Sequence, residues 1–350
     1  MAPSNAFEVN GRTAVITGGS SGMGLCVARQ LAEKGASIVI VARNEDKLLS
    51  GIAHIKGGAL SVETQRFHHI SADLASPSEA VRVIDEVVSW NSGNPPDIVW
   101  CCAGGAHPTL FIDTPVSEFP KQMNTNYFTA LYMAHAALRC WLVSSRDTSA
   151  GTSISTANKS GVAQVIGSIA PRHLIFTASF VSFFTFAGYS PYSPGKAALR
   201  SLSDSLSQEM NLYAAANPRE PRVRVHTIFP ATILTEGLEL EDRVKTDLTK
   251  LLEEGDTPQT PEAIATKSIQ GLESGQEIIT TDFQTGLVRR SMLGGSTRGG
   301  FLRGLVDWFL AGWLAIIMVF VRGDMDSKVQ KWGREFGASG MKSTSSSTRD

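Results

Sequence analysis

The feature that most constrains this chain is a regular alternation of apolar runs with helical stretches between residues 13 and 282. Runs such as TAVITGG and SIVIVAR are apolar at successive positions, which is typical of strands buried on both faces of a sheet. The other runs read DIVWCCAG, RHLIFTAS, VRVHTIFP and EIITTD. Strands that alternate with helices predict an α/β fold with a Rossmann-type, doubly wound parallel sheet.

The segments between these runs have apolar residues at the spacing of a helix. Leu25, Ala28 and Leu31 share one face of a helix over residues 22–34, which Gly35 ends. Further helices are expected after a cap at Ser76, over residues 117–141 and over about residues 194–212.

Composition and charge exclude several classes of protein. Hydrophobic residues make up 42% and charged residues 19% of the 350 positions, which is enough for a large core and carries no signature of disorder. A formal net charge of −1 gives no reason to expect nucleic acid as a partner. The four cysteines form no CxxC pair and no His/Cys cluster, so we expect no metal site and a reducing compartment. The segment MAPSNAFEVNGR lacks the apolar core of a secretory signal, which favours a cytosol-facing protein.

The C-terminal part has a different character. Fourteen uncharged residues, WFLAGWLAIIMVFV, occupy positions 308–321. About 20 apolar residues are needed to cross a bilayer as a straight helix, so this run is short. A buried core helix is one interpretation. A membrane-embedded or interfacial anchor is favoured, because the alternating pattern is complete by Asp282 and because Trp308 and Trp313 suit an interface.

These patterns divide the chain into three parts. Residues 7–285 are expected to form the Rossmann-type domain, interrupted over 144–171 by a surface insertion rich in Ser, Thr, Ala and Gly. Residues 286–337 are expected to form a C-terminal, hydrophobic, membrane-associated helical extension, and residues 338–350 a disordered tail.

A glycine-rich turn, TGGSSGMG, follows the first strand and opens the first helix. Gly18, Gly22 and Gly24 permit a tight turn and a close approach of phosphate to backbone amides, and the helix N-terminus adds a favourable partial charge. Ser20 and Ser21 can donate hydroxyl hydrogen bonds to the phosphate, although serines are common in turns generally. The strand–turn–helix context predicts a dinucleotide-binding site.

The end of the second strand selects between NAD and NADP. An acidic residue there would accept hydrogen bonds from the ribose 2′-hydroxyl and repel a 2′-phosphate. This chain has Ala42 and Arg43, with Lys47 one turn into the next helix. NADPH is therefore the expected cofactor, with Arg43 binding the phosphate, and a solvated basic helix start is the alternative. After a third strand, Asp73 and Leu74 lie where adenine would bind, and the carboxylate either accepts from its amine or caps the next helix.

A phenol and an ammonium lie one helical turn apart in YSPGK, at Tyr192 and Lys196. The spacing alone is a weak signal, but it begins a long helix after a strand that ends at Ser179. A free tyrosine has a pKa of about 10, so a nearby positive charge must lower it for acid–base catalysis. We expect Tyr192 to protonate a substrate carbonyl, Lys196 to lower the phenol pKa and hold the cofactor ribose, and Ser179 to hydrogen-bond the carbonyl oxygen. Tyr189 has a serine four positions on and lacks this pairing.

Asn126 lies inside an apolar helix stripe, in NTNYFTALY. Asparagine is a poor helix former, so its place there needs a reason. We expect it to hold a water near Lys196, and a satisfied polar core residue is the alternative.

These residues resemble the short-chain dehydrogenase/reductase family over about residues 9–282. The shared motifs are the TGxxxGxG loop, the Asp-Leu pair, Asn126, Ser179, Tyr192 with Lys196, and residues 230–235. In that family the last segment frames the nicotinamide carboxamide. Thr235 matches its threonine, so the resemblance implies that Thr235 contacts the cofactor.

A closer resemblance is to 3-ketodihydrosphingosine (3-dehydrosphinganine) reductases of the fungal type. It is carried by TGGSSGMG, ARNEDKL, TNYF, GYSPYSPGKAALRSLSDSLSQEM and FPATILTEGLELED. It implies NADPH-dependent reduction of 3-oxosphinganine, a long-chain keto-amine lipid, to sphinganine in sphingolipid biosynthesis. It also implies the endoplasmic reticulum membrane as location, with the catalytic domain facing the cytosol. The membrane is thus an expected partner, and assembly into a homo-oligomer is left open.

Three residues depart from the wider family pattern and leave the pocket shape open. Cys102 stands where Asn is common, Ala231 where Gly follows proline, and Phe180 where a small residue follows the serine. Phe180 and its neighbours Phe183, Phe184 and Phe186, with residues 232–251, form either the wall of an acyl-chain site or ordinary core.

Two other functions stay open. One is a related reductase that acts on another lipophilic ketone, such as a steroid, a retinoid or a fatty acyl ketone. The other is a non-catalytic NADPH-binding membrane protein, against which the intact set of Ser179, Tyr192 and Lys196 argues.

Overall fold

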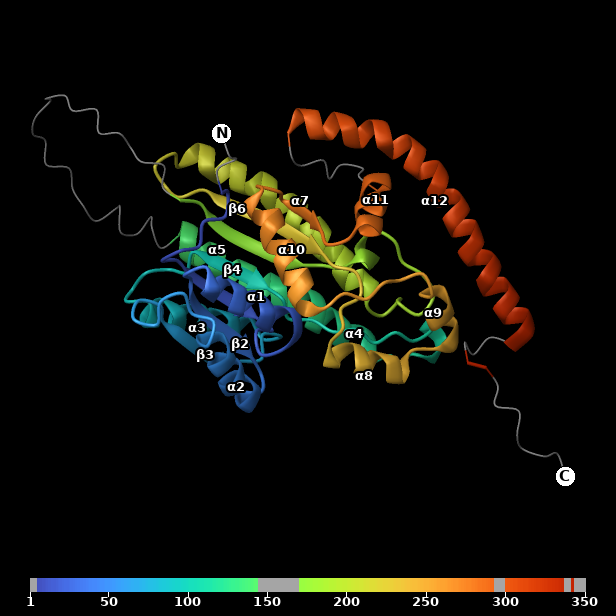
Figure 1. Ribbon diagram of the computed structural model, residues 1–350, viewed down its shortest axis with the longest axis horizontal. Coiled ribbons are helices and arrows are strands. Elements are labelled where there is room, and N and C mark those ends of the chain that lie inside the picture. Colours follow the sequence, from blue (N-terminus) through green and yellow to red (C-terminus); the bar gives the residue numbers. More distant parts are fainter. Residues whose placement is uncertain (1–4, 144–169, 293–299, 337–340, 343–350) are drawn as a thin grey trace, which may run out of the picture.

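A parallel sheet forms the centre of the molecule. The computed structural model describes residues 5–143, 170–292, 300–336 and 341–342. The sheet has seven strands in the order β3-β2-β1-β4-β5-β6-β7, and every neighbouring pair is parallel (Figure 1). The strands are β1 (Thr13–Thr17), β2 (Ser37–Ala42), β3 (Phe67–Ser71), β4 (Ile98–Cys101), β5 (Arg172–Thr177), β6 (Val223–Phe229) and β7 (Ile278–Thr280). This is the predicted doubly wound sheet.

Helices cover both faces of the sheet and bury a separate apolar cluster on each. One face carries α1 (Gly22–Glu33), α2 (Glu45–Lys56) and α10 (Pro261–Glu273). The other carries α3 (Pro77–Trp90), α5 (Thr129–Leu142) and α7 (Ser193–Ala216). Neighbouring strand residues such as Val15 and Ile16 enter opposite clusters, because side chains alternate along a strand. The strands are therefore apolar at successive positions.

Two details differ from the sequence expectation. No apolar run marks β3, whose sequence FHHIS carries two histidines bonded to Glu86 and Glu45, because β3 is an edge strand with partly exposed side chains. The helix expected over 117–141 is interrupted: α4 (Glu118–Met123) leads into a π-helical turn, η2 (Asn124–Phe128), before α5. The predicted insertion over 144–171 and the tail over 338–350 lie almost wholly outside the described residues.

Short elements border the carboxyl ends of the strands. They are the 3-10 turns η1 (Phe111–Asp113) and η3 (Phe180–Ser182), with the helices α8 (Glu236–Val244), α9 (Asp247–Leu252) and α11 (Phe283–Ser291). They lie at the edge of the sheet where a ligand is expected in folds of this type.

A 36-residue helix, α12 (Phe301–Phe336), follows α11 and runs along the outside of the domain past α9 (Figure 1). Asp307 fixes its start through ion pairs with Arg289 (3.4 Å) and Arg290 (3.2 Å) of α11. Trp308 and Trp313 are 72% and 66% exposed, so the alternative of a buried core helix is wrong.

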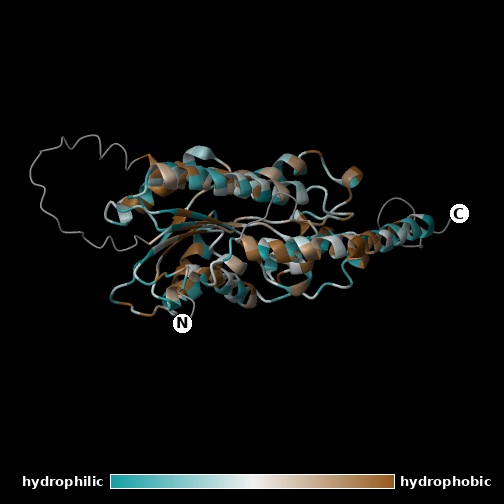
Figure 2. Cartoon of the chain, turned by 90° about the horizontal axis from the view of Figure 1, so that it is seen from above, coloured by the Kyte–Doolittle hydropathy of each residue, from teal (hydrophilic) through white to brown (hydrophobic). Residues whose placement is uncertain are grey.

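The helix is longer than the uncharged run that marks it in the sequence. It continues through the charged residues beyond position 321, and Figure 2 shows it changing from hydrophobic to hydrophilic toward the C-terminus. At about 54 Å it is long enough to span a bilayer, and its length and composition permit a span.

A buried histidine pair links β5 to β6 and makes a pH-dependent contribution to stability. Nδ1 of His173 lies 3.0 Å from Nε2 of His226, and both side chains are fully buried. Burial lowers the pKa of His173 to about 2. In the unfolded chain His173 takes up a proton near pH 6.5, whereas in the folded chain it does not. The free energy of unfolding therefore keeps its full value above pH 6.5 and declines as the pH falls below it.

We predict that His173→Asn, which keeps a donor toward His226, flattens this acid decline. Between pH 6.5 and 4.5 the wild-type free energy of unfolding should fall more steeply than that of the variant, by about 1 kcal/mol per pH unit. Denaturant titrations at several pH values measure both slopes. Equal slopes would show that His173 is protonated in the folded protein.

Candidate active site

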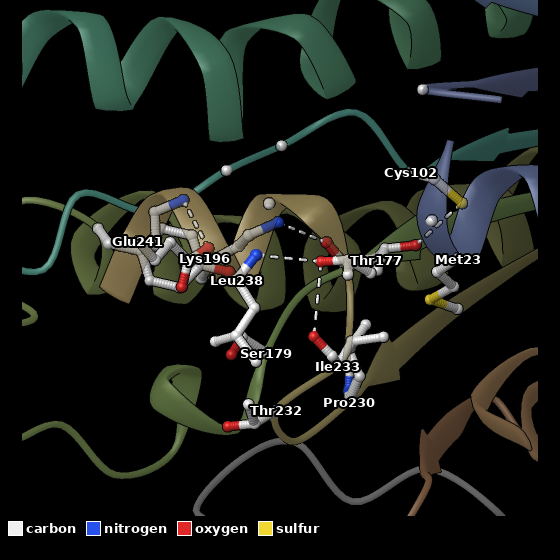
Figure 3. A pocket seen from close by; sticks show the side chains of 18 of the residues that line it. Met23, Cys102, Thr177, Ser179, Lys196, Pro230, Thr232, Ile233, Leu238 and Glu241 are labelled. Carbon is white, nitrogen blue, oxygen red and sulfur yellow. Dashed lines mark hydrogen bonds between the residues drawn. The ribbon is translucent and has the colours of Figure 1, made fainter. Parts of the chain in front are cut away.

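A single large cleft runs along the carboxyl ends of the strands. Its volume is about 1990 Å³, and it extends from the glycine-rich turn through the end of β5 to α12. Figure 3 shows its middle part, around Thr177, Ser179 and Lys196. In doubly wound sheets ligands bind in this crevice, where the strand order reverses between β1 and β4.

The glycine-rich turn forms one end of the cleft and has no room for side chains. A Cβ atom on Gly18 would lie 2.9 Å from backbone atoms of Ala103, and Gly18 has a φ of +65°. A Cβ on Gly24 would lie 2.4 Å from the carbonyl oxygen of Gly18. Gly22 faces Thr235, whose Cγ2 would lie 3.2 Å from an added Cβ. With Ser20 and Ser21, these residues line a cradle of backbone atoms that fits a diphosphate.

The residues expected to bind the adenosine part of the cofactor all line the same cleft, but each makes different contacts there. Arg43 is exposed at the end of β2 and lines the cleft. Lys47 also lines it, but its Nζ forms an ion pair with Glu236 at 2.7 Å, which joins α2 to α8. Asp73 accepts a hydrogen bond from the amide of Ala75 (3.1 Å), which favours a structural role beside any contact with adenine.

Three side chains meet where β5 ends and α7 begins. Tyr192 immediately precedes α7, and Pro194 in the first turn needs no amide donor. Lys196, one turn on, is 3% exposed and donates from Nζ to the carbonyl oxygen of Thr177 at 2.9 Å (Figure 3). Its Nζ lies 5.6 Å from the centroid of the Tyr192 ring, and Ser179 hydrogen-bonds to Tyr192. The structure thus brings all three predicted residues together.

Burial dominates the electrostatics of this group. It raises the pKa of Tyr192, and the negative charge of Glu241 raises it further, while the Ser179 hydrogen bond opposes both. Burial lowers the pKa of Lys196 to about 8. The expectation that Lys196 lowers the phenol pKa is wrong for this geometry, since the ammonium is directed at Thr177 and desolvation of the phenol outweighs it. Tyr192 therefore keeps its proton at neutral pH, which is the form a proton donor needs.

Asn126 lies within the π-helical turn and is fully buried. Its Oδ1 accepts from the amide of Gly105 (3.1 Å), and its Nδ2 donates to the carbonyl of Gly105 (2.9 Å) and to Gln122. These bonds fix the segment that follows β4. The same segment packs closely on Lys196, since a Cβ added to Gly104 would lie only 3.0 Å from Lys196 Nζ. That Asn126 also holds a water there stays a prediction.

The rest of the cleft has an apolar wall. Phe180, Phe184 and Phe186 line it, whereas Phe183 packs on Phe229 in the core with ring centroids 4.2 Å apart. The opposite wall is formed by α12, which was not predicted from the sequence to line the cleft. Its residues recur every three or four positions, so they share one helix face; they are Leu314, Ile317, Met318, Val321 and Met325.

Two further polar residues of the cleft have distinct roles. Tyr189 lines it, but its hydroxyl donates to Glu253 at 2.5 Å. Glu241 of α8 also lines the cleft; it was not singled out from the sequence, although it lies in the segment FPATILTEGLELED.

Among the described residues, no group of three or more His, Cys, Asp or Glu side chains could hold a metal ion.

Comparisons with known proteins agree with this geometry. Residues 12–170 match the model of the short chain dehydrogenase family. The chain is 46% identical to a 3-ketodihydrosphingosine reductase of Aspergillus fumigatus, over 95% of this chain and 88% of the relative. It is 38% identical to a 3-ketodihydrosphingosine reductase of Neurospora crassa, over 95% and 85%.

Solved structures support the fold. A short-chain type dehydrogenase/reductase from Mycobacterium marinum aligns with a TM-score of 0.62 at 23% identity, over 79% of this chain and 96% of that one. A short chain dehydrogenase from Burkholderia cenocepacia, solved in complex with NADP, aligns with a TM-score of 0.58 at 19% identity, over 79% and 98%.

The packing of the glycine-rich turn yields a second prediction. Gly24→Ala places a methyl group against the backbone of Gly18, so it should destabilise the fold by about 1–3 kcal/mol and weaken dinucleotide binding. Gly255→Ala is a matched control, because nothing lies within 4 Å of an added Cβ in the same cleft. Thermal melts and fluorescence titration with NADPH measure both effects. Unchanged melting and binding in Gly24→Ala would contradict the close packing described.

Proposed function

The chain belongs to the short-chain dehydrogenase/reductase family, and from this premise we propose that it reduces 3-ketodihydrosphingosine to sphinganine with NADPH. One observation carries the proposal beyond the names of the relatives. A single cleft joins the glycine-rich turn, the proton donor Tyr192 and an apolar helix face on α12, as the reduction of a lipid ketone requires. The named relatives are 3-ketodihydrosphingosine reductases, which places this chemistry in sphingolipid biosynthesis.

The chemistry follows from the three residues at the start of α7. NADPH, when bound in the cleft, supplies the hydride that reduces the C3 carbonyl. Tyr192 gives its proton to the carbonyl oxygen, and Ser179 hydrogen-bonds the same oxygen as negative charge develops on it. Lys196, held by the carbonyl oxygen of Thr177, would hydrogen-bond the nicotinamide ribose. Lys196 is buried, whereas Tyr192 and Ser179 are partly exposed in the cleft, where a substrate can reach them.

The cofactor assignment rests on the end of β2. Arg43 and the absence of an acid at that strand end favour a 2′-phosphate over a free 2′-hydroxyl. Gly18, Ser20, Ser21, Gly22 and Gly24 would hold the diphosphate. The remaining contacts proposed are Lys47, Asp73, Leu74 and Thr235.

We assign residues 7–285 to catalysis and 286–337 to membrane association. The outward face of α12 is apolar and exposed, and the opposite face lines the cleft, so a membrane on the outside of α12 would lie next to the acyl-chain site. We place the protein at the endoplasmic reticulum membrane with its catalytic domain in the cytosol, as the resemblance to the fungal reductases implies.

The role of Tyr192 leads to a third prediction. Tyr192→Phe removes the proton donor and should lower kcat for 3-ketodihydrosphingosine by about 100-fold or more, with NADPH affinity retained. Tyr189→Phe is the control, because that hydroxyl is bonded to Glu253, and it should change kcat by no more than about tenfold. NADPH oxidation and sphinganine formation are measured together. Full activity in Tyr192→Phe would exclude Tyr192 as the donor.

The exposed face of α12 leads to a fourth prediction. Trp313→Glu with Phe320→Glu places two charges on that face, outside the cleft lining, and should lower binding to lipid vesicles by about tenfold or more. Leu212→Glu, at an equally exposed position of α7, should leave vesicle binding unchanged. Vesicle flotation of the full chain measures the bound fraction. Wild-type flotation of the double variant would show that α12 is not the anchor.

A further inference from the structure

The reaction end of the cleft contains a carboxylate that the proposed chemistry does not use. Glu241 lies on α8, is partly buried, and lines the cleft (Figure 3). Its Oε1 accepts a hydrogen bond from the amide of Ala106 at 3.3 Å. Ala106 is two residues from Gly104, the residue that packs against Lys196 Nζ. One short backbone segment therefore connects Glu241 to the catalytic group.

The carboxylates that neighbour Glu241 have cationic or hydroxyl partners. Glu253 pairs with Lys245 at 2.8 Å and accepts from Tyr189. Asp242 pairs with the same lysine at 2.9 Å. Within the part of the chain that the structure describes, Glu241 forms no ion pair with a lysine or arginine at 4.0 Å or less. Lys245, the nearby cation, forms its close ion pairs with Asp242 and Glu253, so Glu241 is a partly buried carboxylate without a direct ion pair of its own.

The charge of Glu241 acts on the reacting groups. Glu241, Tyr192 and Lys196 line the same cleft. The carboxylate adds to the rise in the pKa of Tyr192 and partly offsets the lowering of the pKa of Lys196 by burial. Burial, with the neighbouring carboxylates, raises the pKa of Glu241, and the Ala106 amide and the charge of Lys245 offset only part of this rise. Nearby positive charge would stabilise its anionic form.

The chemistry of a keto-amine matches this arrangement. In 3-ketodihydrosphingosine the amine is on the carbon next to the carbonyl carbon, so an ammonium must lie beside any carbonyl oxygen bound to Tyr192. We propose that Glu241 binds the substrate ammonium and thereby selects an α-amino ketone over a simple long-chain ketone. This inference rests on the proposed function, since it assigns a specificity residue to the same site.

The pairing would also assist proton transfer. An ammonium bound to Glu241 neutralises the charge that disfavours ionisation of the phenol. Tyr192 then becomes a stronger acid when the correct substrate is present. A ketone that lacks the amine would bind without this effect.

The test compares two substrates that differ only in the amine: 3-ketodihydrosphingosine and the 1-hydroxy-3-ketone of equal chain length. Glu241→Gln should lower kcat/KM for the keto-amine by about 10- to 100-fold, as expected for loss of a hydrogen-bonded charge pair. It should not lower kcat/KM for the amine-free ketone, because that substrate loses no ion pair and the charge that disfavours ionisation of Tyr192 is removed. Glu239→Gln, at an exposed position on α8, should leave both values unchanged.

The outcomes separate this inference from the proposed function. If the wild-type protein does not reduce the keto-amine, the proposed function fails, whatever the variants do. If it does, then an equal loss for both substrates in Glu241→Gln, or no loss for either, overturns the role of Glu241.

A measurement without any variant gives an independent answer. The wild-type protein should favour the keto-amine over the amine-free ketone by about tenfold or more in kcat/KM. A ratio near one would overturn the proposal even if Glu241→Gln proved too unstable to assay. NADPH affinity and thermal melting confirm that each variant is folded.

Discussion

The parallel direction of all seven strands is the constraint on which the rest of this structure depends. It brings every strand's carboxyl end to one edge, so residues far apart in sequence share a single cleft. The glycine-rich turn after β1, Ser179 after β5 and Thr235 after β6 all lie there for this reason. Both faces of the sheet are covered by helices, which leaves this edge as the place where a ligand can reach the backbone.

Within the cleft, desolvation rather than any single ion pair sets the state of the reacting groups. It keeps the proton on Tyr192 and lowers the pKa of Lys196 to about 8. The carboxylate of Glu241 adds to the effect on the phenol. A substrate that carries its own positive charge would reverse that contribution. Recognition of the amine and activation of the proton donor would then be the same event.

The sequence predicts the sheet, the glycine-rich turn and the Tyr192–Lys196 pair because each depends on local pattern. It places a third strand before Asp73 but shows no apolar run there, since an edge strand needs none. It cannot give the direction of the Tyr192 pKa shift, which depends on burial by distant segments. The wall formed by α12 was also missed. Its inward residues recur at helical spacing, but the outward face is apolar too, so no polar face reveals which side packs on the domain.

The decisive measurement is the reduction of 3-ketodihydrosphingosine by the purified 350-residue chain. The purified protein in lipid vesicles is given equal concentrations of this keto-amine, a steroid ketone, a retinaldehyde and a fatty acyl ketone, with NADPH or NADH. We expect sphinganine to form in an amount equal to the NADPH oxidised, with the keto-amine as the best substrate and NADPH preferred to NADH. A higher kcat/KM for any of the other carbonyl compounds, or no turnover of the keto-amine, would contradict it.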